Sequence, residues 1–335
     1  MVNTGKPGRM VTMRRRTLLL SLLATGTVSA CADRSLTAVS SSSTPILGST
    51  TVSSLAPQSV TPVVPQPGAA PARSFTVGRR DLTLSRGADR PLPTRLWYPA
   101  EGAVPSVPAP VDNATPAPGA YPLILFSHGL TAHPSDFEAM LSRWAQAGFV
   151  VAGPAFPHTS YGVDDFDAED IVNQPADVRY VLDRILGLGA DPLRAIIDEH
   201  RVAAAGHSGG GITTVGLFSA QRDARLKAGM VIAGTDFQGT PFTGPPAPML
   251  FVHGTGDDTV AYAAARTVFE AVPWSRAMLT VEGGGHVIES DSFEPITRTG
   301  TEFWRWSLYG DATSKTRLAA AAKVNGVTTW DNQLG

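Results

Sequence analysis

The 335-residue chain contains a single cysteine, Cys31. One thiol cannot close a disulfide within the chain, and it cannot supply the cysteines of a structural zinc or iron–sulfur site. The chain also lacks a large excess of charge of either sign. It has 27 Lys and Arg and 29 Asp and Glu, for a formal net charge of −2. This balance argues against general electrostatic binding to nucleic acid. We therefore expect neither a disulfide-stabilised fold nor a nucleic-acid-binding protein.

The motifs of the common cofactor and metal sites are missing as well. There is no G-x-x-x-x-G-K-[ST] phosphate loop, no G-x-G-x-x-G after a strand, and no H-E-x-x-H pair among the seven histidines. The acidic run from Asp164 to Asp170 lacks the glycine and the terminal glutamate of an EF-hand loop, so a solvated loop is expected there. We predict an activity that needs no cofactor and no metal ion.

The first 30 residues are typical of an export signal. The basic residues Arg14-Arg15-Arg16 precede an apolar run, Leu18 to Val28, that is too short to span a bilayer with margin. Val28-Ser29-Ala30-Cys31 resembles the bacterial lipobox, in which the cysteine is lipidated. We predict a lipid anchor at Cys31 on the outer face of the cell membrane. A plain signal peptide, which leads to secretion, and a retained anchor are the alternatives, and the export route is open between Sec and twin-arginine.

Residues 31–73 differ in composition from the rest of the chain. No charged side chain occurs between Ser35 and Ala72, where Ser, Thr, Pro, Val and Ala dominate. Such a segment buries too little apolar surface to offset its chain entropy, so a disordered tether is expected. We place the catalytic domain at residues 74–312 and a C-terminal tail at 313–335.

Within residues 74–312, short apolar runs alternate with amphipathic segments. Strands are expected at 75–84, 94–98, 123–126, 149–152, 202–205, 228–233, 249–252 and 277–281. Helices are expected at 135–147, where Ser135 and Glu138 have the spacing of a capping box, and at 176–186, 212–218 and 261–272. Strands that alternate with helices imply a mostly parallel central sheet flanked by helices. We predict a single α/β domain.

The strongest local motif is Gly206-His207-Ser208-Gly209-Gly210, a G-x-S-x-G sequence directly after an expected strand and before an expected helix. In this context the serine lies on a tight turn, with its hydroxyl exposed above the sheet. A glycine-rich helix start that binds phosphate is the alternative, but no lysine follows within the loop. The motif predicts that Ser208 is a nucleophile.

A serine nucleophile needs a base to take its proton and a third group to orient that base. In α/β-hydrolases the acid follows the serine in the chain, and the histidine comes last. Asp257 follows the expected strand 249–252, with Asp258 as the local alternative. His286 follows three glycines and is the only histidine after Asp257. We predict a triad of Ser208, His286 and Asp257.

An oxyanion hole requires two backbone donors. The N–H of Gly209, after the nucleophile, and the N–H of Leu130, after the strand 123–126, are the candidates. His128 and His253 are expected to order their loops. The loops 154–170 and 235–246 follow strands and are expected to form the pocket walls through their aromatic side chains, Phe156, Tyr161, Phe166, Phe237 and Phe242.

Several of these motifs together resemble the α/β-hydrolase superfamily. They are Trp97-Tyr98-Pro99, Ser127-His128-Gly129, the motif around Ser208, His253-Gly254 with Asp257, and His286. More narrowly, residues 74–312 are similar to the bacterial branch related to platelet-activating-factor acetylhydrolase and dienelactone hydrolase. At position 209, where this chain has glycine, many members of that branch carry a bulkier side chain, and dienelactone hydrolases use a cysteine nucleophile.

The resemblance implies the α/β-hydrolase fold and a serine esterase or lipase-like hydrolase that acts on a small-molecule ester or a lipid. A monomer is expected. Two alternatives remain: an acyltransferase that passes the acyl group to a cell-envelope acceptor, and a non-catalytic surface lipoprotein that uses the same fold for binding.

Overall fold

The computed structural model describes residues 60–335 of the chain. The predicted signal peptide, Cys31 and most of the predicted tether lie outside the described residues. No helix among residues 60–335 combines the length and the apolar character that crossing a membrane requires.

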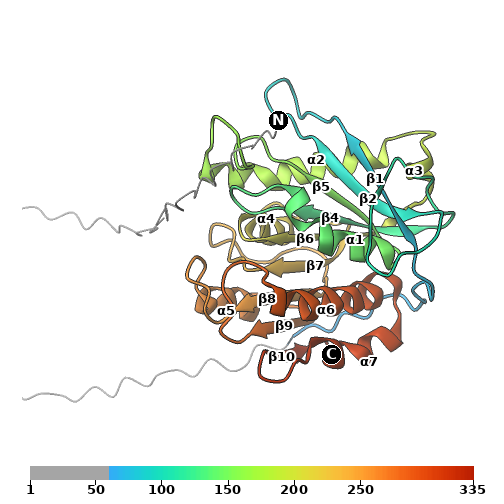
Figure 1. The fold of residues 1–335 in the computed structure, drawn as a ribbon. Coiled ribbons are helices and arrows are strands. Elements are labelled where there is room, and N and C mark those ends of the chain that lie inside the picture. The colour runs from blue at the N-terminus through green and yellow to red at the C-terminus, as the bar shows by residue number, and fades with distance from the viewer. Residues whose placement is uncertain (1–59) are drawn as a thin grey trace, which may run out of the picture. The chain divides into compact units, whose positions relative to one another are not determined.

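The described part is built on one ten-stranded sheet (Figure 1), in the order β10-β9-β8-β7-β6-β4-β5-β2-β1-β3. The six strands from β9 to β5 in this order run parallel, whereas β10, β2 and β1 join antiparallel to their neighbours in the central sheet. The strands are β1 Thr76–Leu82, β2 Thr94–Ala100, β3 Val111–Asp112, β4 Tyr121–Ser127, β5 Val150–Pro154, β6 Ile197–His207, β7 Leu226–Ile232, β8 Met249–Gly254, β9 Arg276–Val281 and β10 Thr328–Gln333.

Helices cover both faces of the sheet. They are α1 Glu138–Gln146, α2 Gln174–Leu186, α3 Pro192–Ala195, α4 Gly209–Phe218, α5 Tyr262–Ala271, α6 Ser290–Tyr309 and α7 Ala312–Ala322, with short 3-10 helices η1 Pro134–Phe137 and η2 Ala168–Asn173. One core contains side chains of α2, α4 and α5, and the other contains side chains of α1, α6 and α7. This is the predicted α/β-hydrolase fold in a single domain.

The strand β4 is buried along its whole length because each face of the sheet meets a helical layer there. In β4, Leu123 and Leu125 belong to one core, and Ile124 and Phe126 belong to the other. This two-residue alternation is the geometry of an extended strand. It explains why β4 is a continuous apolar run in the sequence.

The helix expected at 135–147 begins differently from the prediction. The capping box is formed by His133 and Asp136, not by Ser135 and Glu138. His133 is extended at φ −136° and ψ 152°, and Pro134 follows it as the first residue of η1. Proline is favoured at this position because its φ suits a helix and its missing N–H would have no partner within the helix.

The folded unit extends further at both ends than the expected range 74–312. Residues 60–73 are not part of a free tether: Thr61 N–H donates to the Pro273 carbonyl at 2.8 Å, and Gly68 N–H donates to the Gly310 carbonyl at 3.4 Å. The expected tail 313–335 contains most of α7 and all of β10, which pairs with β9. Both segments therefore belong to the body of the fold.

Ser275 joins these two terminal segments, and its replacement provides a test. The Ser275 side chain is buried; its Oγ accepts the Val63 N–H at 2.8 Å and donates to the Leu334 carbonyl at 3.1 Å. Ser275→Ala leaves both backbone groups unpaired, so we expect the free energy of unfolding to fall by about 1–3 kcal/mol in urea denaturation. Ser142→Ala is the control, since that buried hydroxyl has no hydrogen-bond partner among the described residues. Equal losses in both variants would contradict the prediction.

Candidate active site

Ser208 lies on the turn between β6 and α4, with φ 56° and ψ −120°. A non-glycine residue rarely adopts such a positive φ, and strain of this kind is frequent at functional sites. The Ser208 N–H donates to the Ile232 carbonyl at 2.9 Å. A Cβ atom at Gly206 would overlap the Gly210 carbonyl oxygen, and one at Gly210 would overlap the Ser127 carbonyl oxygen. The flanking glycines are therefore required by the close approach of three backbone segments.

The three side chains predicted to form a triad lie in one hydrogen-bonded row. His286 Nε2 is 2.8 Å from Ser208 Oγ, and His286 Nδ1 is 2.8 Å from Asp257 Oδ2. Asp257 is buried, and its Oδ1 accepts the N–H groups of Thr259 and Val260 at 2.9 and 2.8 Å. Asp258, the alternative acid, is exposed and contacts Thr259 instead. A carboxylate fixed by backbone donors holds an imidazole in one orientation.

His207 contacts the main chain of His286, a role that the sequence analysis missed. Its Nε2 donates to the His286 carbonyl at 2.8 Å, and the two rings lie 5.1 Å apart between centroids. Burial lowers the pKa of His207 to about 4, so the ring is neutral near pH 7. His207 therefore fixes the backbone of the glycine-rich loop that carries His286. The sequence shows that His207 lies inside the G-x-S-x-G motif, but it does not show that His207 bonds the His286 carbonyl.

The other two histidines near the site order their loops, as expected. His128 Nδ1 donates to the Gly129 carbonyl at 2.7 Å, and its Nε2 accepts the Phe156 N–H at 3.2 Å. Burial lowers its pKa to about 4. His253 Nε2 donates to the Val260 carbonyl at 2.8 Å and lies 3.2 Å from Asp257 Oδ2, and burial lowers the pKa of His253 too.

The two candidate oxyanion donors lie on neighbouring segments beside Ser208. A Cβ atom on Gly209 would be 3.4 Å from Leu130 Cγ and 3.1 Å from Ile171 Cδ1. A Cβ atom on Gly129 would be 3.0 Å from Ser208 Cβ. The side chains of Leu130 and Ile171 therefore lie against position 209, where many members of the branch that this chain resembles carry a bulkier residue.

A cavity of about 560 Å³ adjoins Ser208 and His286. This volume is within the usual range for small-molecule sites. Most of its lining is apolar and comes from the segment after β4, from α1, from the loop that carries His286, and from α6: Leu130, Ala132, Phe137, Ala139, Met140, Val287, Ile288 and Phe293. Asp136 is its one acidic lining residue.

The predicted aromatic walls are wrong, because none of the five side chains lines this cavity. Phe156 and Phe237 are buried in the core, where Phe237 packs against Gly216 of α4. Phe242 packs against Trp274, while Tyr161 and Phe166 are 78% and 43% exposed. Loop position indicated the correct edge of the sheet but not the direction in which each side chain points.

The acidic run 164–170 is not wholly solvated. Asp170 is buried and forms an ion pair with Arg90 at 2.8 Å. Within the described part of the chain, no group of three or more His, Cys, Asp or Glu side chains is arranged to hold a metal ion.

Comparison with known proteins gives one family. The model of the chlorophyllase family, an α/β-hydrolase-type family, matches residues 88–251. The matched range includes Leu130, Ser208 and Gly209 and ends before Asp257 and His286. No curated protein matches the chain. Together with the parallel sheet, the match fits the α/β-hydrolase superfamily and supports a general assignment as an ester hydrolase.

The two buried histidines predict how stability depends on pH. The pKa values of His128 and His207 are lowered to about 4, below the ordinary value of 6.5, so the unfolded chain takes up protons that the folded chain does not. The free energy of unfolding is therefore highest above pH 6.5 and falls as the pH drops towards 4, by on the order of 3 kcal/mol for each histidine. Urea denaturation between pH 7.5 and 4.5 measures this. His128→Asn, which retains a donor for the Gly129 carbonyl, should flatten the dependence, and an unchanged slope would contradict the prediction.

Proposed function

We propose that the protein hydrolyses carboxylic esters through an acyl-enzyme formed on Ser208. The observation that carries this proposal is the row from Ser208 Oγ through the His286 imidazole to Asp257, in which both hydrogen bonds measure 2.8 Å. The chlorophyllase-family match supports it independently. The resemblance to the bacterial branch related to platelet-activating-factor acetylhydrolase points to the same reaction class.

Each group has a role in the proposed reaction. Ser208 Oγ attacks the ester carbonyl carbon while His286 Nε2 accepts the hydroxyl proton, and Asp257 stabilises the imidazolium that forms. The N–H groups of Gly209 and Leu130 bind the oxyanion of the tetrahedral intermediate. His286 then donates the proton to the leaving alcohol. Water, with its proton taken by His286, attacks the acyl-enzyme, and the collapse of the second intermediate releases the carboxylic acid and restores Ser208.

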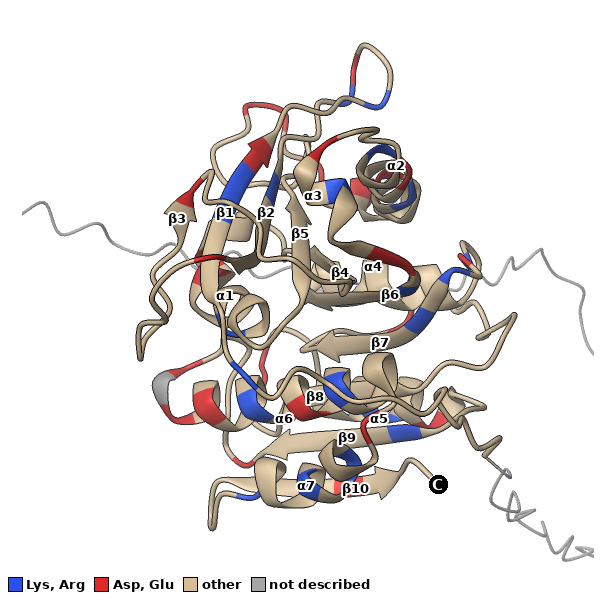
Figure 2. Cartoon of the chain, turned by 90° about the vertical axis from the view of Figure 1, so that its right-hand side faces the viewer, with Lys and Arg blue, Asp and Glu red and all other residues tan. Residues whose placement is uncertain are grey.

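We propose that the substrate is an uncharged ester with an apolar group. The cavity beside Ser208 is lined mostly by apolar side chains, and its lining contains no Lys or Arg. The segments that follow β4, β5, β7, β8 and β9 also contain no Lys or Arg, although they carry acidic residues such as Asp136, Asp258 and Glu289. Basic side chains occur instead on elements such as α2, α6 and α7 (Figure 2). A region of one sign repels ligands of the same sign.

We also propose, from the sequence, that the domain is exported, anchored by a lipid at Cys31, and monomeric. Mass determination of the protein from a membrane fraction tests the anchor. An unmodified cysteine, or cleavage elsewhere, would show that the protein is secreted or retained by other means.

The triad is tested by three substitutions. Ser208→Ala removes the nucleophile, so turnover of p-nitrophenyl butyrate and labelling by a fluorophosphonate probe should both be lost. Asp257→Asn should lower kcat by about 10³–10⁴-fold, because the imidazole loses its orienting acceptor. Asp258→Asn is the matched control and should leave kcat within about twofold of wild type.

The outcomes separate the alternatives. Substantial turnover by Ser208→Ala would refute the assignment. A wild-type protein that neither labels nor turns over would support the non-catalytic lipoprotein. If added alcohols capture most of the acyl group as new esters, the protein is an acyltransferase instead of a hydrolase.

Charge selectivity gives a separate prediction. The kcat/KM for the anionic ester mono-p-nitrophenyl succinate should be about 10-fold or more below that for p-nitrophenyl butyrate, which has a similar size. Raising the salt concentration should narrow the difference because it screens the acidic residues. Asp136→Asn should also narrow it, whereas Glu270→Gln, an exposed residue of α5, should not. Equal kcat/KM values at low salt would contradict the proposed substrate class.

A further inference from the structure

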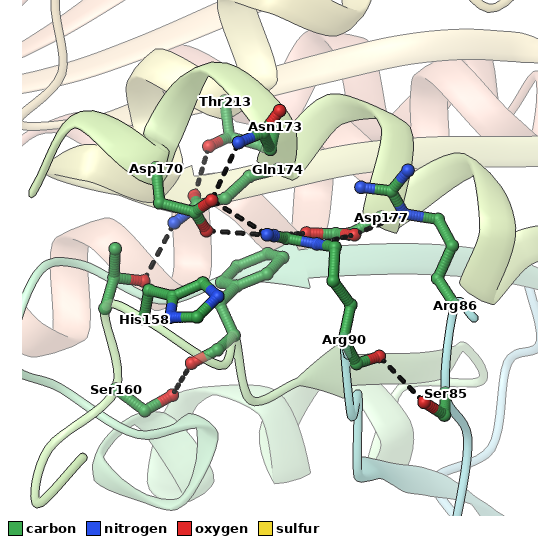
Figure 3. Close-up of polar contacts among 12 residues, drawn as sticks. Ser85, Arg86, Arg90, His158, Ser160, Asp170, Asn173, Gln174, Asp177 and Thr213 are labelled. Atoms are coloured by element: carbon green, nitrogen blue, oxygen red, sulfur yellow. Dashed lines mark hydrogen bonds and ion pairs between the residues drawn. The ribbon is translucent and has the colours of Figure 1, made fainter. Parts of the chain in front are cut away.

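A buried amide lies behind the candidate active site and takes no part in the proposed steps. Gln174 is the first residue of α2 and is 1% exposed. Its Nε2 donates to Thr159 Oγ1 at 2.8 Å, and its Oε1 accepts the Thr213 hydroxyl at 2.5 Å (Figure 3). Thr159 and Thr213 are fully buried as well. Hydrogen bonds between buried polar groups rigidify the elements that they join.

Each hydrogen-bond partner of Gln174 is itself hydrogen-bonded to a residue at or next to one of the candidate oxyanion donors. The Thr159 carbonyl accepts the N–H of Thr131, the residue after Leu130, at 2.8 Å. The Thr213 hydroxyl lies 3.0 Å from the carbonyl oxygen of Gly209. Gln174 therefore spans the space between the loop that carries the Leu130 N–H and the helix that carries the Gly209 N–H.

An ion-pair cluster fixes the chain on both sides of Gln174 (Figure 3). The Arg90 guanidinium bonds Asp170 at 2.8 and 2.9 Å, and it bonds Asp177 at 3.0 and 2.5 Å. Burial alone would raise the pKa of Asp170, but Arg90 and Asn173 hold it below its ordinary value, so the carboxylate is charged. Arg90 thus ties η2 to α2 and limits the movement of Gln174.

The separation of the two donors matters because an oxyanion is stabilised only when both N–H groups lie about 2.7–3.1 Å from it. Leu130 and Gly209 belong to different segments, so no covalent geometry sets their separation. A displacement of about 1 Å in such a site can cost about 100-fold in rate. A rigid link between the two segments is one way to set this distance.

We propose that Gln174 is a positioning residue for the oxyanion hole, which sets the separation of the Leu130 and Gly209 N–H groups through Thr159 and Thr213. This inference rests on the proposed ester hydrolysis. It assigns Gln174 no contact with the substrate. Its replacement should therefore weaken the stabilisation of the transition state and leave ground-state binding almost unchanged.

The chain offers a matched pair for the test. Thr213 and Thr214 are both fully buried in α4, and each hydroxyl bonds the carbonyl four residues earlier, at 3.0 and 2.9 Å. Of the two, only Thr213 is hydrogen-bonded to Gln174. Thr213→Val and Gln174→Met should each lower kcat for p-nitrophenyl butyrate by about 10-fold or more, with KM within about twofold of wild type. Thr214→Val should lower the melting temperature without this loss of kcat.

The kcat of the double variant Gln174→Met/Thr213→Val should lie within about twofold of the kcat of the slower single variant, because both changes break the same link. If Gln174→Met does not fold, the comparison of Thr213→Val with Thr214→Val decides alone. Wild-type kcat in Gln174→Met or Thr213→Val, or an equal loss of kcat in Thr214→Val, would overturn the positioning role. If the positioning role is overturned in this way but Ser208→Ala is inactive, the proposed hydrolysis still stands. An active Ser208→Ala would refute the proposed hydrolysis itself.

Discussion

The approach of three backbone segments around Ser208 is the constraint on which the rest of the site depends. The turn after β6, the start of α4 and the end of β4 meet where Gly206, Gly210 and Ser127 come into contact, and no side chain fits between them. The positive φ of Ser208 is unfavourable by itself, at a cost of about 1–3 kcal/mol. It persists because β6 is hydrogen-bonded on both sides, to β4 and β7, and its apolar residues are buried. A rigid central strand therefore holds the strained residue that we propose as the nucleophile.

Burial determines which histidine can act as a base. His128, His207 and His253 are buried, bond backbone groups, and have pKa values lowered by desolvation. A neutral ring that donates its N–H to a backbone carbonyl can fix a loop. His128 bonds the Gly129 carbonyl and His207 bonds the His286 carbonyl, so these two rings fix the loops that lie beside Ser208. His286 differs because its side chain is partly exposed and its Nε2 faces Ser208. Of the four imidazoles near the candidate site, three thus bond backbone groups, and the fourth, that of His286, is the proposed base.

The sequence was sufficient where the signal is local and insufficient where a partner lies far along the chain. The central strands were predictable because burial on both faces produces continuous apolar runs. The candidate triad was predictable because its members come in the expected order and each follows a strand, β6, β8 or β9. The helix α6 was missed, and Pro295 lies inside it. The strand β10 was missed because five of its six residues are polar and it pairs on one side only, with β9. Gln174 and His207 could not be assigned roles because their partners are up to 79 residues away.

The segment 168–177 joins the packing beside Gly209 to the hydrogen bonds of Gln174. Ile171 and Leu130 lie beside Gly209, where a Cβ atom would be 3.1 Å from Ile171 Cδ1 and 3.4 Å from Leu130 Cγ, so even alanine at this position would require Ile171 to shift slightly. The same segment carries Gln174, and Arg90 holds it in place through Asp170 and Asp177. A smaller side chain in place of Ile171 would leave a gap beside Gly209 and loosen the packing between this segment and the start of α4. The packing beside Gly209 and the proposed link between the two candidate donors therefore cannot be varied independently, because one clamped segment supplies both the packing and the hydrogen bonds.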